Sequence, residues 1–223
     1  MNESDEYALE QALLLRRNLG GKVTAITVGS IRSQDILHVS LAKGVDDTIR
    51  IDADEFDPNV VSFLLARTIK RMDHDLILTG VESSDGMSSQ VPIALGAELG
   101  VPYVYAVTNL AAESNETPLS VTRELGGGRY QNLEVEKPAL LCMQSGTVPL
   151  TYTPVVKLIH ARRKGIAPTS ISDLGITSEE LVQRRKTKII DIKPIEKNSS
   201  TQWLSGSPEE ISLQVIDIIN KAL

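Results

Sequence analysis

The sequence predicts an α/β fold: a mostly parallel, Rossmann-like sheet with helices on both faces, then an antiparallel extension and a C-terminal arm. Before Thr108, apolar runs of strand length alternate with amphipathic segments of roughly 10 to 15 residues, which is typical of parallel sheets. After Thr108, three strand-like runs follow one another with almost no helix between them. From Thr147 onward, Pro, Ser, Thr and basic residues predominate, and the core pattern fades.

The first part of the chain divides at its capping residues and glycines. Residues 2–5 supply side-chain oxygens and acidic groups suited to the start of a helix, and Gly20 with Gly21 ends it. Pro58 is well placed in the first turn of another helix. The expected elements are a helix up to Gly20, a strand at 22–28, a helix at 31–43, a strand at 48–51, a helix at 58–72, a strand around Leu76, a helix at 93–99 and a strand at 102–107.

The second part predicts antiparallel strands at 119–124, 130–135 and 139–143, with residues 126–128, three glycines, turning the first pair. We expect these strands to extend the same sheet. Ser207 with Glu210 predicts the capped start of a final helix, whose apolar stripe needs a surface to pack on. We therefore expect a nucleotide-binding domain at 1–165 and, at 166–223, an arm and helix that pack on a partner. The stripe consists of Ile211, Val215, Ile218 and Ile219.

Composition narrows the class of protein. The chain has 223 residues and a formal net charge of −6, which disfavours duplex nucleic acid as the main partner. No apolar run approaches the roughly 18 residues of a membrane span, and the acidic N-terminus does not resemble a signal peptide. The lone Cys142 fits a reducing compartment, so we expect a cytoplasmic protein, and its apolar strand predicts a core residue rather than a nucleophile.

A serine-rich turn, "LTGVESSDGMSSQVP", connects the strand at Leu76 to the helix at 93–99. In open α/β sheets ligands bind where strands end and helices begin, and the first turn of a helix favours an anion. Gly80 and Gly86 allow close backbone approach, while Gln90 adds an amide near the helix start. Ser83, Ser84, Ser88 and Ser89 add hydroxyl donors. The turn matches neither a Walker loop nor GxGxxG, and an ordinary solvent-exposed loop with a serine cap is the alternative.

Several motifs together resemble the β subunit of electron transfer flavoproteins. They are "DEYALEQALLLRRNLGGKVTAITVG", "SLAKGVDDTIRID", "DLILTGVESSDGMSSQVPIALGAELGVP", "VTRELGGGRYQNLEVEKPALLCM" and "YTPVVKLIHARRKGI". Gly126 stands where the family signature usually has an acidic residue. Arg123, Gly127, Gly128, Gln131, Leu133 and Pro138 fit that signature.

The resemblance implies an electron-carrier subunit rather than a stand-alone catalyst. Family members are heterodimers whose α subunit carries the redox FAD, while the β subunit binds AMP, or a second FAD in electron-bifurcating members. Electrons pass from flavin-dependent dehydrogenases, such as those of fatty acid oxidation, or from ferredoxin and NADH, to a quinone oxidoreductase or another acceptor. The flavin supplies the chemistry and the protein positions it. No direct membrane insertion and no nucleic-acid partner are expected.

Carried onto this chain, the resemblance predicts a nucleotide site in three parts. Asn2, Glu3, Ser4 and Asp5 match the turn near adenosine, and Val28 matches the strand end that touches adenine through its backbone. The third part surrounds ribose and phosphate, with its last four residues nearest phosphate. It consists of Gly80, Val81, Glu82, Ser83, Ser84, Asp85, Gly86, Met87, Ser88, Ser89, Gln90 and Val91.

Two departures from the family pattern carry expectations of their own. The family begins with a strand of the "KILVCVK" type inside the sheet, whereas this sequence starts at the helix, so we expect a gapped sheet and an incomplete site. The dehydrogenase-anchoring loop usually has Leu before a Pro, whereas Thr153 precedes Pro154 here. Tyr152 or Val155 would have to substitute.

Other polar and aromatic residues have two interpretations each. Glu82 with Asp85 suggests hydrogen bonding to ribose or water rather than acid–base catalysis. The basic run at 160–164 is either a solvated helix face or a guide for an acidic partner. Trp203 is either an interface anchor or buried under the last helix. The three histidines, which are far apart in sequence and lack Cys partners, predict no metal site: His38, His74 and His160.

Two other functions fit a similar fold. A stand-alone adenine-nucleotide sensor would work without a flavin partner. An enzyme that cleaves the α–β phosphate bond of ATP would need a Ser-Gly-Gly-x-Asp-Ser loop after the first strand, and the sequence has no such loop.

Overall fold

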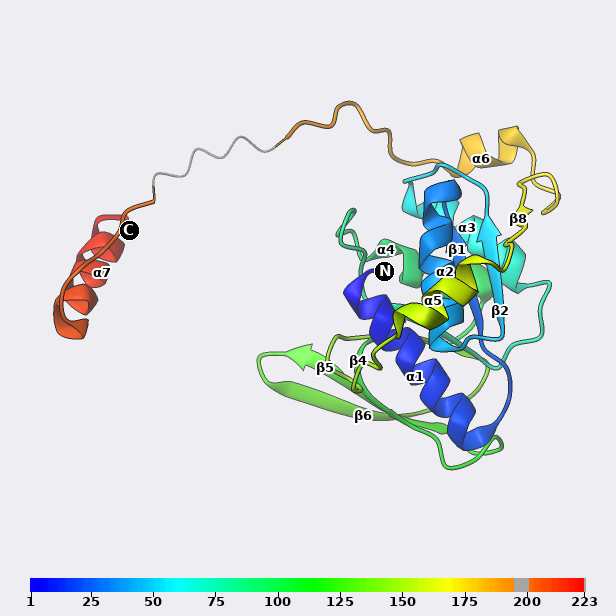
Figure 1. Cartoon of the computed structure of the whole chain (residues 1–223), viewed down its shortest axis with the longest axis horizontal. Coiled ribbons are helices and arrows are strands. Elements are labelled where there is room, and N and C mark those ends of the chain that lie inside the picture. Colours follow the sequence, from blue (N-terminus) through cyan, green and yellow to red (C-terminus); the bar gives the residue numbers. More distant parts are fainter. Residues whose placement is uncertain (195–200, 223) are drawn as a thin grey trace. The chain divides into compact units, whose positions relative to one another are not determined.

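The computed structural model describes residues 1–194 and 201–222, which belong to two compact units (Figure 1). The first unit is Met1–Lys188 and the second is Ile189–Leu223. The first unit contains α1 (Glu3–Leu19), β1 (Thr24–Val28), a 3₁₀ turn η1 (Ile31–Ser33), α2 (Gln34–Lys43), β2 (Asp47–Ile51), α3 (Pro58–Ile69), β3 (Leu76–Gly80), α4 (Gln90–Leu99), β4 (Tyr103–Ala111), β5 (Leu119–Gly126), β6 (Arg129–Val135), β7 (Ala139–Met143), α5 (Val155–Arg162), β8 (Pro168–Thr169) and α6 (Ser178–Arg184).

The strands form two sheets, so the prediction of a single sheet is wrong. One sheet has the order β1-β2-β8 with parallel pairs, and the other has the order β3-β7-β4-β5-β6. In the second sheet, β3, β7 and β4 are parallel and β5 and β6 extend it antiparallel. β1 and β3 are each an edge strand of their sheet. A gapped sheet was expected, but not the place of the gap. The mostly parallel α/β class with an antiparallel extension is confirmed.

Helices cover both faces of the five-stranded sheet because β7 is apolar on both sides. Its five residues are all buried, and successive side chains in a strand point to opposite faces. Leu141 and Met143 pack with Ala8 of α1, whereas Leu140 and Cys142 pack with Ala66 of α3 and Leu95 of α4. Burial raises the pKa of the Cys142 thiol to about 11, so its assignment as a core residue is confirmed.

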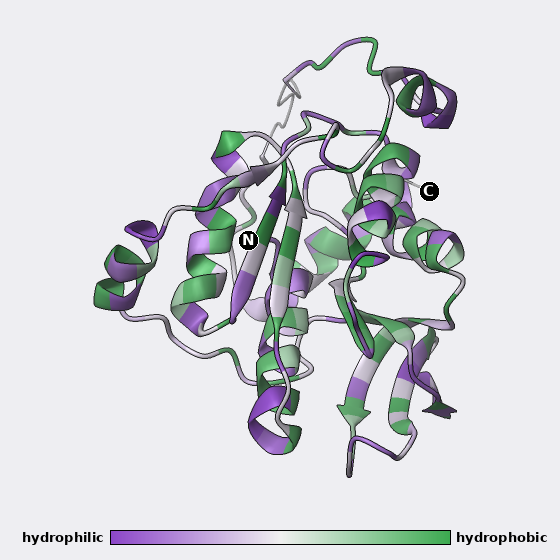
Figure 2. Ribbon diagram, turned by 90° about the vertical axis from the view of Figure 1, so that its right-hand side faces the viewer, coloured by the Kyte–Doolittle hydropathy of each residue, from purple (hydrophilic) through white to green (hydrophobic). Residues whose placement is uncertain are grey.

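In the three-stranded sheet, alternate side chains of β1 also pack against helices on opposite faces. Ile26 and Val28 of β1 pack beside the Ile51 cluster of β2 and α3, whereas Ala25 packs beside Leu9 and other residues on the α1 and α2 side. Figure 2 shows helices of the first unit with hydrophobic and hydrophilic residues on different sides, as expected for helices that cover a sheet.

Most predicted boundaries hold within a few residues, with two informative differences. The helix predicted at 31–43 begins as a 3₁₀ turn and becomes α-helical at Gln34. The helix predicted from residue 93 starts a turn earlier, at Gln90, so that Pro92 lies in its first turn. The hairpin between β5 and β6 turns at Gly127 and Gly128, both with positive φ, as predicted.

The second unit contains α7 (Pro208–Ala222). The predicted cap is confirmed, because Glu210 N donates to Ser207 Oγ at 3.3 Å and Ser207 N donates to Glu210 Oε2 at 2.8 Å. Trp203 is 89% exposed, so the interpretation that it is buried is wrong. No helix within the described residues is long and apolar enough to cross a membrane. Five apolar side chains of α7 are exposed: Leu213, Val215, Ile216, Ile218 and Ile219.

A buried ion pair joins α1, α2 and the segment before α5. The side chains of Lys43 and Glu10 are each 2% exposed, and Lys43 Nζ lies 2.6 Å from Glu10 Oε1 and 2.9 Å from Glu6 Oε1. Thr151 donates its N–H and its hydroxyl to Glu10, at 3.1 and 3.0 Å, and its carbonyl accepts from Lys43. Burial by itself raises the pKa of Glu10, but the hydrogen bonds from Lys43 and Thr151 outweigh it, so the net pKa is lowered.

We predict that Glu10→Gln lowers the free energy of unfolding at pH 7 by about 3 kcal/mol, because it leaves a buried ammonium short of its partner. A lowered folded-state pKa means that the ionised Glu10 stabilises the protein fully above the ordinary value of 4.5. This contribution is lost as the pH falls through the folded-state pKa. The difference between wild type and variant in urea unfolding should therefore shrink below about pH 4.5.

Glu6→Gln is the matched control, since Glu6 pairs with the same Lys43 but its side chain is 31% exposed. Its effect should be clearly smaller. Equal losses in both variants, or a difference that does not change with pH, would contradict the prediction.

Candidate functional site

The predicted site lies where β3 ends and α1 and α4 begin. In a parallel sheet the carboxyl ends of the strands meet the N-termini of the following helices, and these helix ends carry unpaired N–H groups. β3 ends at Gly80, α4 starts at Gln90, and the serine-rich loop joins them. α1, which starts at Glu3, packs on β3.

Hydrogen bonds tie the start of α1 to the serine-rich loop. Asn2 Nδ2 donates to the carbonyl of Glu82 at 2.6 Å, and Ser4 Oγ donates to the same carbonyl at 3.1 Å. Ser84 Oγ donates to Asn2 Oδ1 at 2.6 Å, and the N–H of Gly80 donates to Asp5 Oδ1 at 2.7 Å. The structure thus brings together two of the three predicted parts, residues 2–5 and residues 80–84. We call these contacts the α1–β3 joint.

The joint uses the side chains differently from a helix cap. Asn2 occupies the N-cap position of α1 but makes no side-chain cap hydrogen bond, because its amide faces the loop. Gly80 is required for the close approach. A Cβ at this position would lie 2.2 Å from Ser4 Oγ and 2.8 Å from Asp5 N, and the latter atom belongs to the backbone. Glu3 takes no part in the recorded contacts of the joint and carries its charge in the first turn of the helix.

The start of α4 has no side-chain cap. Ser89 occupies the N-cap position with φ 53°, but its hydroxyl donates instead to Glu82 Oε2 at 3.1 Å. Met87 also has a positive φ, of 45°. Left-handed residues next to a helix start turn backbone N–H groups toward one side and form concave anion-binding sites. The N–H groups of Gln90 and Val91 therefore have no side-chain acceptor, which suits a phosphate.

The loop contains carboxylates but no lysine or arginine between residues 80 and 91. Asp85 accepts from its neighbour Gly86 N at 2.7 Å. A hydrogen bond from Ser83, then one from the Gly86 backbone, lower the pKa of Asp85. An ionised, hydrogen-bonded carboxylate is a poor general acid, so Asp85 serves as a hydrogen-bond acceptor. Glu82 accepts a hydrogen bond from Ser89. Such carboxylate oxygens can accept hydrogen bonds from hydroxyl groups. The side chain of Ser88 is exposed and has no hydrogen-bond partner among the described residues.

Val28 belongs to the other sheet. It ends β1 in register with Ile51 of β2, and its side chain packs with the cluster beneath α3. No recorded hydrogen bond of Val28 reaches residues 80–91. The structure therefore brings residues 2–5 and residues 80–84 together, and it leaves Val28 at the end of the neighbouring sheet.

The segment before and within α5 exposes both apolar and basic side chains. Tyr152 and Val155, the residues predicted to replace the anchoring leucine, are 79% and 63% exposed. Within the basic run, Arg162 has a recorded partner, Asp35 at 3.7 Å, and both side chains are mostly exposed. The described residues contain no group of three His, Cys, Asp or Glu side chains placed to hold a metal ion.

The sequence is similar to proteins of one known family. The electron transfer flavoprotein domain family matches residues 1–169. The chain is similar to "Electron transfer flavoprotein subunit beta" of Bacillus subtilis, with 30% identity over 98% of this chain and 85% of the relative. The protein of that name from Methylophilus methylotrophus is 28% identical over 99% of this chain and 86% of the relative. Protein FixA of Azotobacter vinelandii is 29% identical over 82% of this chain and 67% of the relative.

We predict that Gly80→Ala displaces the first turn of α1 and lowers the free energy of unfolding by about 1–3 kcal/mol, because the Asp5 backbone cannot move aside cheaply. Gly86→Ala is the control, since its nearest neighbour would be Ser83 Oγ at 3.3 Å. Urea unfolding of both variants checks this prediction. A loss in Gly86→Ala as large as in Gly80→Ala would show that the joint does not need the glycine.

Proposed function

The chain belongs to the electron transfer flavoprotein family, on the β-subunit side, and we propose that it binds AMP or a second FAD and works with a FAD-carrying α subunit. In this proposal the heterodimer carries electrons from flavin-dependent dehydrogenases to a quinone-linked acceptor in the cytoplasm. The observation that carries the proposal is the α1–β3 joint beside the uncapped start of α4.

The residues at this place fit an adenine nucleotide. Carboxylate oxygens of Glu82 and Asp85 are suitable acceptors for ribose hydroxyls, and the N–H groups of Gln90 and Val91 are suitable donors to one phosphate. The absence of lysine and arginine from the loop favours a ligand with few negative charges, such as AMP or the diphosphate of FAD, over a triphosphate. We place the adenosine near residues 2–5, with Val28 on its adenine side.

A flavin bound in the complex supplies the electron transfer chemistry, whereas AMP supplies none and holds the fold around its site. The part of this chain is to bind and orient. The α1–β3 joint fixes the position of the serine-rich loop. The buried Glu10–Lys43 pair fixes the position of Thr151. The loop and Thr151 are therefore both held by rigid elements.

The surface features support protein partners. The exposed apolar side chains of α7 need an apolar surface, and we assign them to the α subunit. The exposed Tyr152 and Val155, followed by the basic end of α5, suit a dehydrogenase whose apolar pocket has an acidic rim. A sensor that works alone would leave both surfaces without an occupant.

We predict that the chain, co-expressed with an α subunit, yields one flavin and one AMP per heterodimer after denaturation, or two flavins if it bifurcates electrons. Ser88→Asp should lower the nucleotide retained in the β site roughly tenfold, because a carboxylate there repels phosphate. Ser120→Asp makes the same charge change at an exposed position of β5 and should change nothing. A heterodimer that holds no nucleotide beyond the FAD of the α subunit would reject the site, and full function without any flavin partner would favour the sensor.

A further inference from the structure

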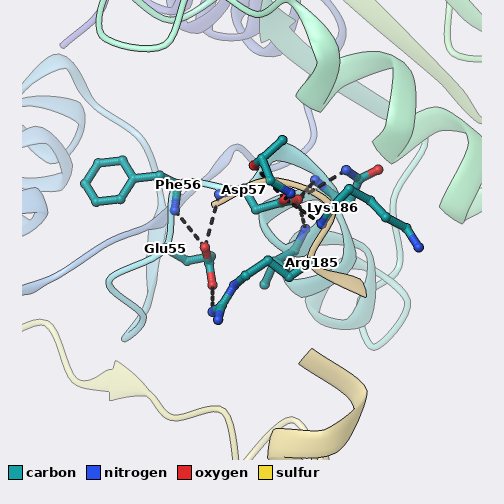
Figure 3. A network of polar contacts seen from close by, with 8 residues as sticks. Glu55, Phe56, Asp57, Arg185 and Lys186 are labelled. Carbon is teal, nitrogen blue, oxygen red and sulfur yellow. Dashed lines mark hydrogen bonds and ion pairs between the residues drawn. The ribbon is translucent and has the colours of Figure 1, made fainter. Parts of the chain in front are cut away.

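Asp57, at the start of α3, bonds to two parts of the chain that are far apart in sequence (Figure 3). Its Oδ1 accepts from the N–H groups of Asn59 and Val60, at 2.8 and 3.4 Å, and so caps the helix. Its Oδ2 accepts from the N–H groups of Lys186 and Thr187, at 2.7 and 2.6 Å, and from Thr187 Oγ1 at 2.8 Å. Asp57 is 2% exposed. We call Asp57, Lys186 and Thr187 the Asp57 clasp.

Neighbouring contacts hold the same segment. Glu55 forms an ion pair with Arg185, and its other oxygen accepts from Asp57 N at 3.1 Å, so it supports the clasp from both sides (Figure 3). One residue earlier, Arg184 pairs with Glu98 and lies over the ring of Phe63, 4.5 Å from its centroid. The chain is therefore fastened continuously from α6 to Thr187.

The clasp is the last fastening before the chain leaves the first unit. That unit ends at Lys188, directly after Thr187. The following Ile189, Ile190 and Ile192 are exposed, and so is the apolar side of α7. Within two residues of Thr187, the chain therefore changes from a hydrogen-bonded segment to one whose apolar side chains are exposed.

Only one oxygen of Asp57 is needed for the helix cap. Ser, Thr and Asn cap as well as Asp, each with a single oxygen. The second oxygen is used entirely by Lys186 and Thr187, which Asn or Ser would not satisfy. Burial raises the pKa of Asp57, but the bonds from Thr187, Lys186 and Asn59 outweigh it and lower the pKa, so the carboxylate is ionised at neutral pH.

We propose that Asp57 is a positioning residue for partner binding, because it fixes the point from which segment 189–222 leaves the first unit. The inference rests on the proposed function and requires that the α subunit contacts the first unit as well as α7. A fixed departure point leaves fewer residues to be ordered when the partner binds, which lowers the entropy lost on binding. The partner is a subunit with an apolar surface for α7.

The test is Asp57→Asn in the full-length chain. One oxygen remains to cap α3, but an amide NH₂ group now faces two N–H donors, so the clasp opens selectively. Hydrogen exchange of the Lys186 and Thr187 amides should accelerate at least about tenfold, and trypsin should cut faster after Arg184, Arg185 and Lys186. The Kd for the α subunit should rise roughly two- to threefold, because the freed residues must be ordered again when the partner binds.

Two further variants separate the possible outcomes. Asp57→Ala removes the cap as well, so it should destabilise the first unit more than Asp57→Asn does. Ile219→Asp places a charge on the apolar side of α7 and should weaken α-subunit binding while leaving exchange at Lys186 and Thr187 unchanged.

If Ile219→Asp leaves α-subunit binding unchanged, the second unit does not bind the partner, and the proposed role of that unit fails together with the clasp. If Ile219→Asp weakens binding but Asp57→Asn opens the clasp at an unchanged Kd, the positioning role alone is overturned. Unchanged amide exchange in Asp57→Asn would overturn the clasp itself.

Discussion

The contact between the start of α1 and the end of β3 is the constraint on which the candidate site depends. Backbone groups at the end of a strand need partners when they are removed from water. Here side chains of α1 provide them: Asp5 accepts from Gly80 N, while Asn2 and Ser4 donate to the carbonyl of Glu82. These bonds occupy the polar groups that would otherwise cap α1. They also tie residues 80–84 to the first turn of α1, ahead of the start of α4, which has no side-chain cap.

Buried charges follow the same logic elsewhere in the first unit. Lys43 and Asp57 are almost fully buried, and each has several hydrogen-bond partners that offset the cost of leaving water. Both join elements that are distant in sequence. Lys43 links α2 to α1 and to Thr151, whereas Asp57 links α3 to the segment after α6. Apolar packing is less directional than these ionic contacts. Lys43 therefore fixes the position of Thr151, and Asp57 fixes the position of Thr187.

Much of the fold was predictable because it is encoded locally. The continuous apolar run of β7 identifies a strand buried on both faces, and the three glycines at 126–128 identify a hairpin turn. The division into two sheets was expected only as a gap of unstated position, because strand order depends on contacts that no local pattern records. The α1–β3 joint was predicted only in part. The resemblance placed residues 2–5 and 80–91 around one ligand, but it did not predict the hydrogen bonds between Asn2 and the loop. Asp57 before Pro58 is a recognisable cap signal, yet its second oxygen bonds residues about 130 positions later.

The two units differ in how their apolar surface is satisfied, and this difference bears on function. In the first unit, alternate residues of β7 are covered by α1 on one side and by α3 and α4 on the other. In the second unit, α7 has a capped start and a regular apolar side, but these side chains remain exposed. A helix of 15 residues gains little stability from propensity alone, and most helices in proteins depend on packing of such a side. The sequence of α7 therefore makes sense only with a covering surface, and the proposed α subunit is the partner whose binding would supply it.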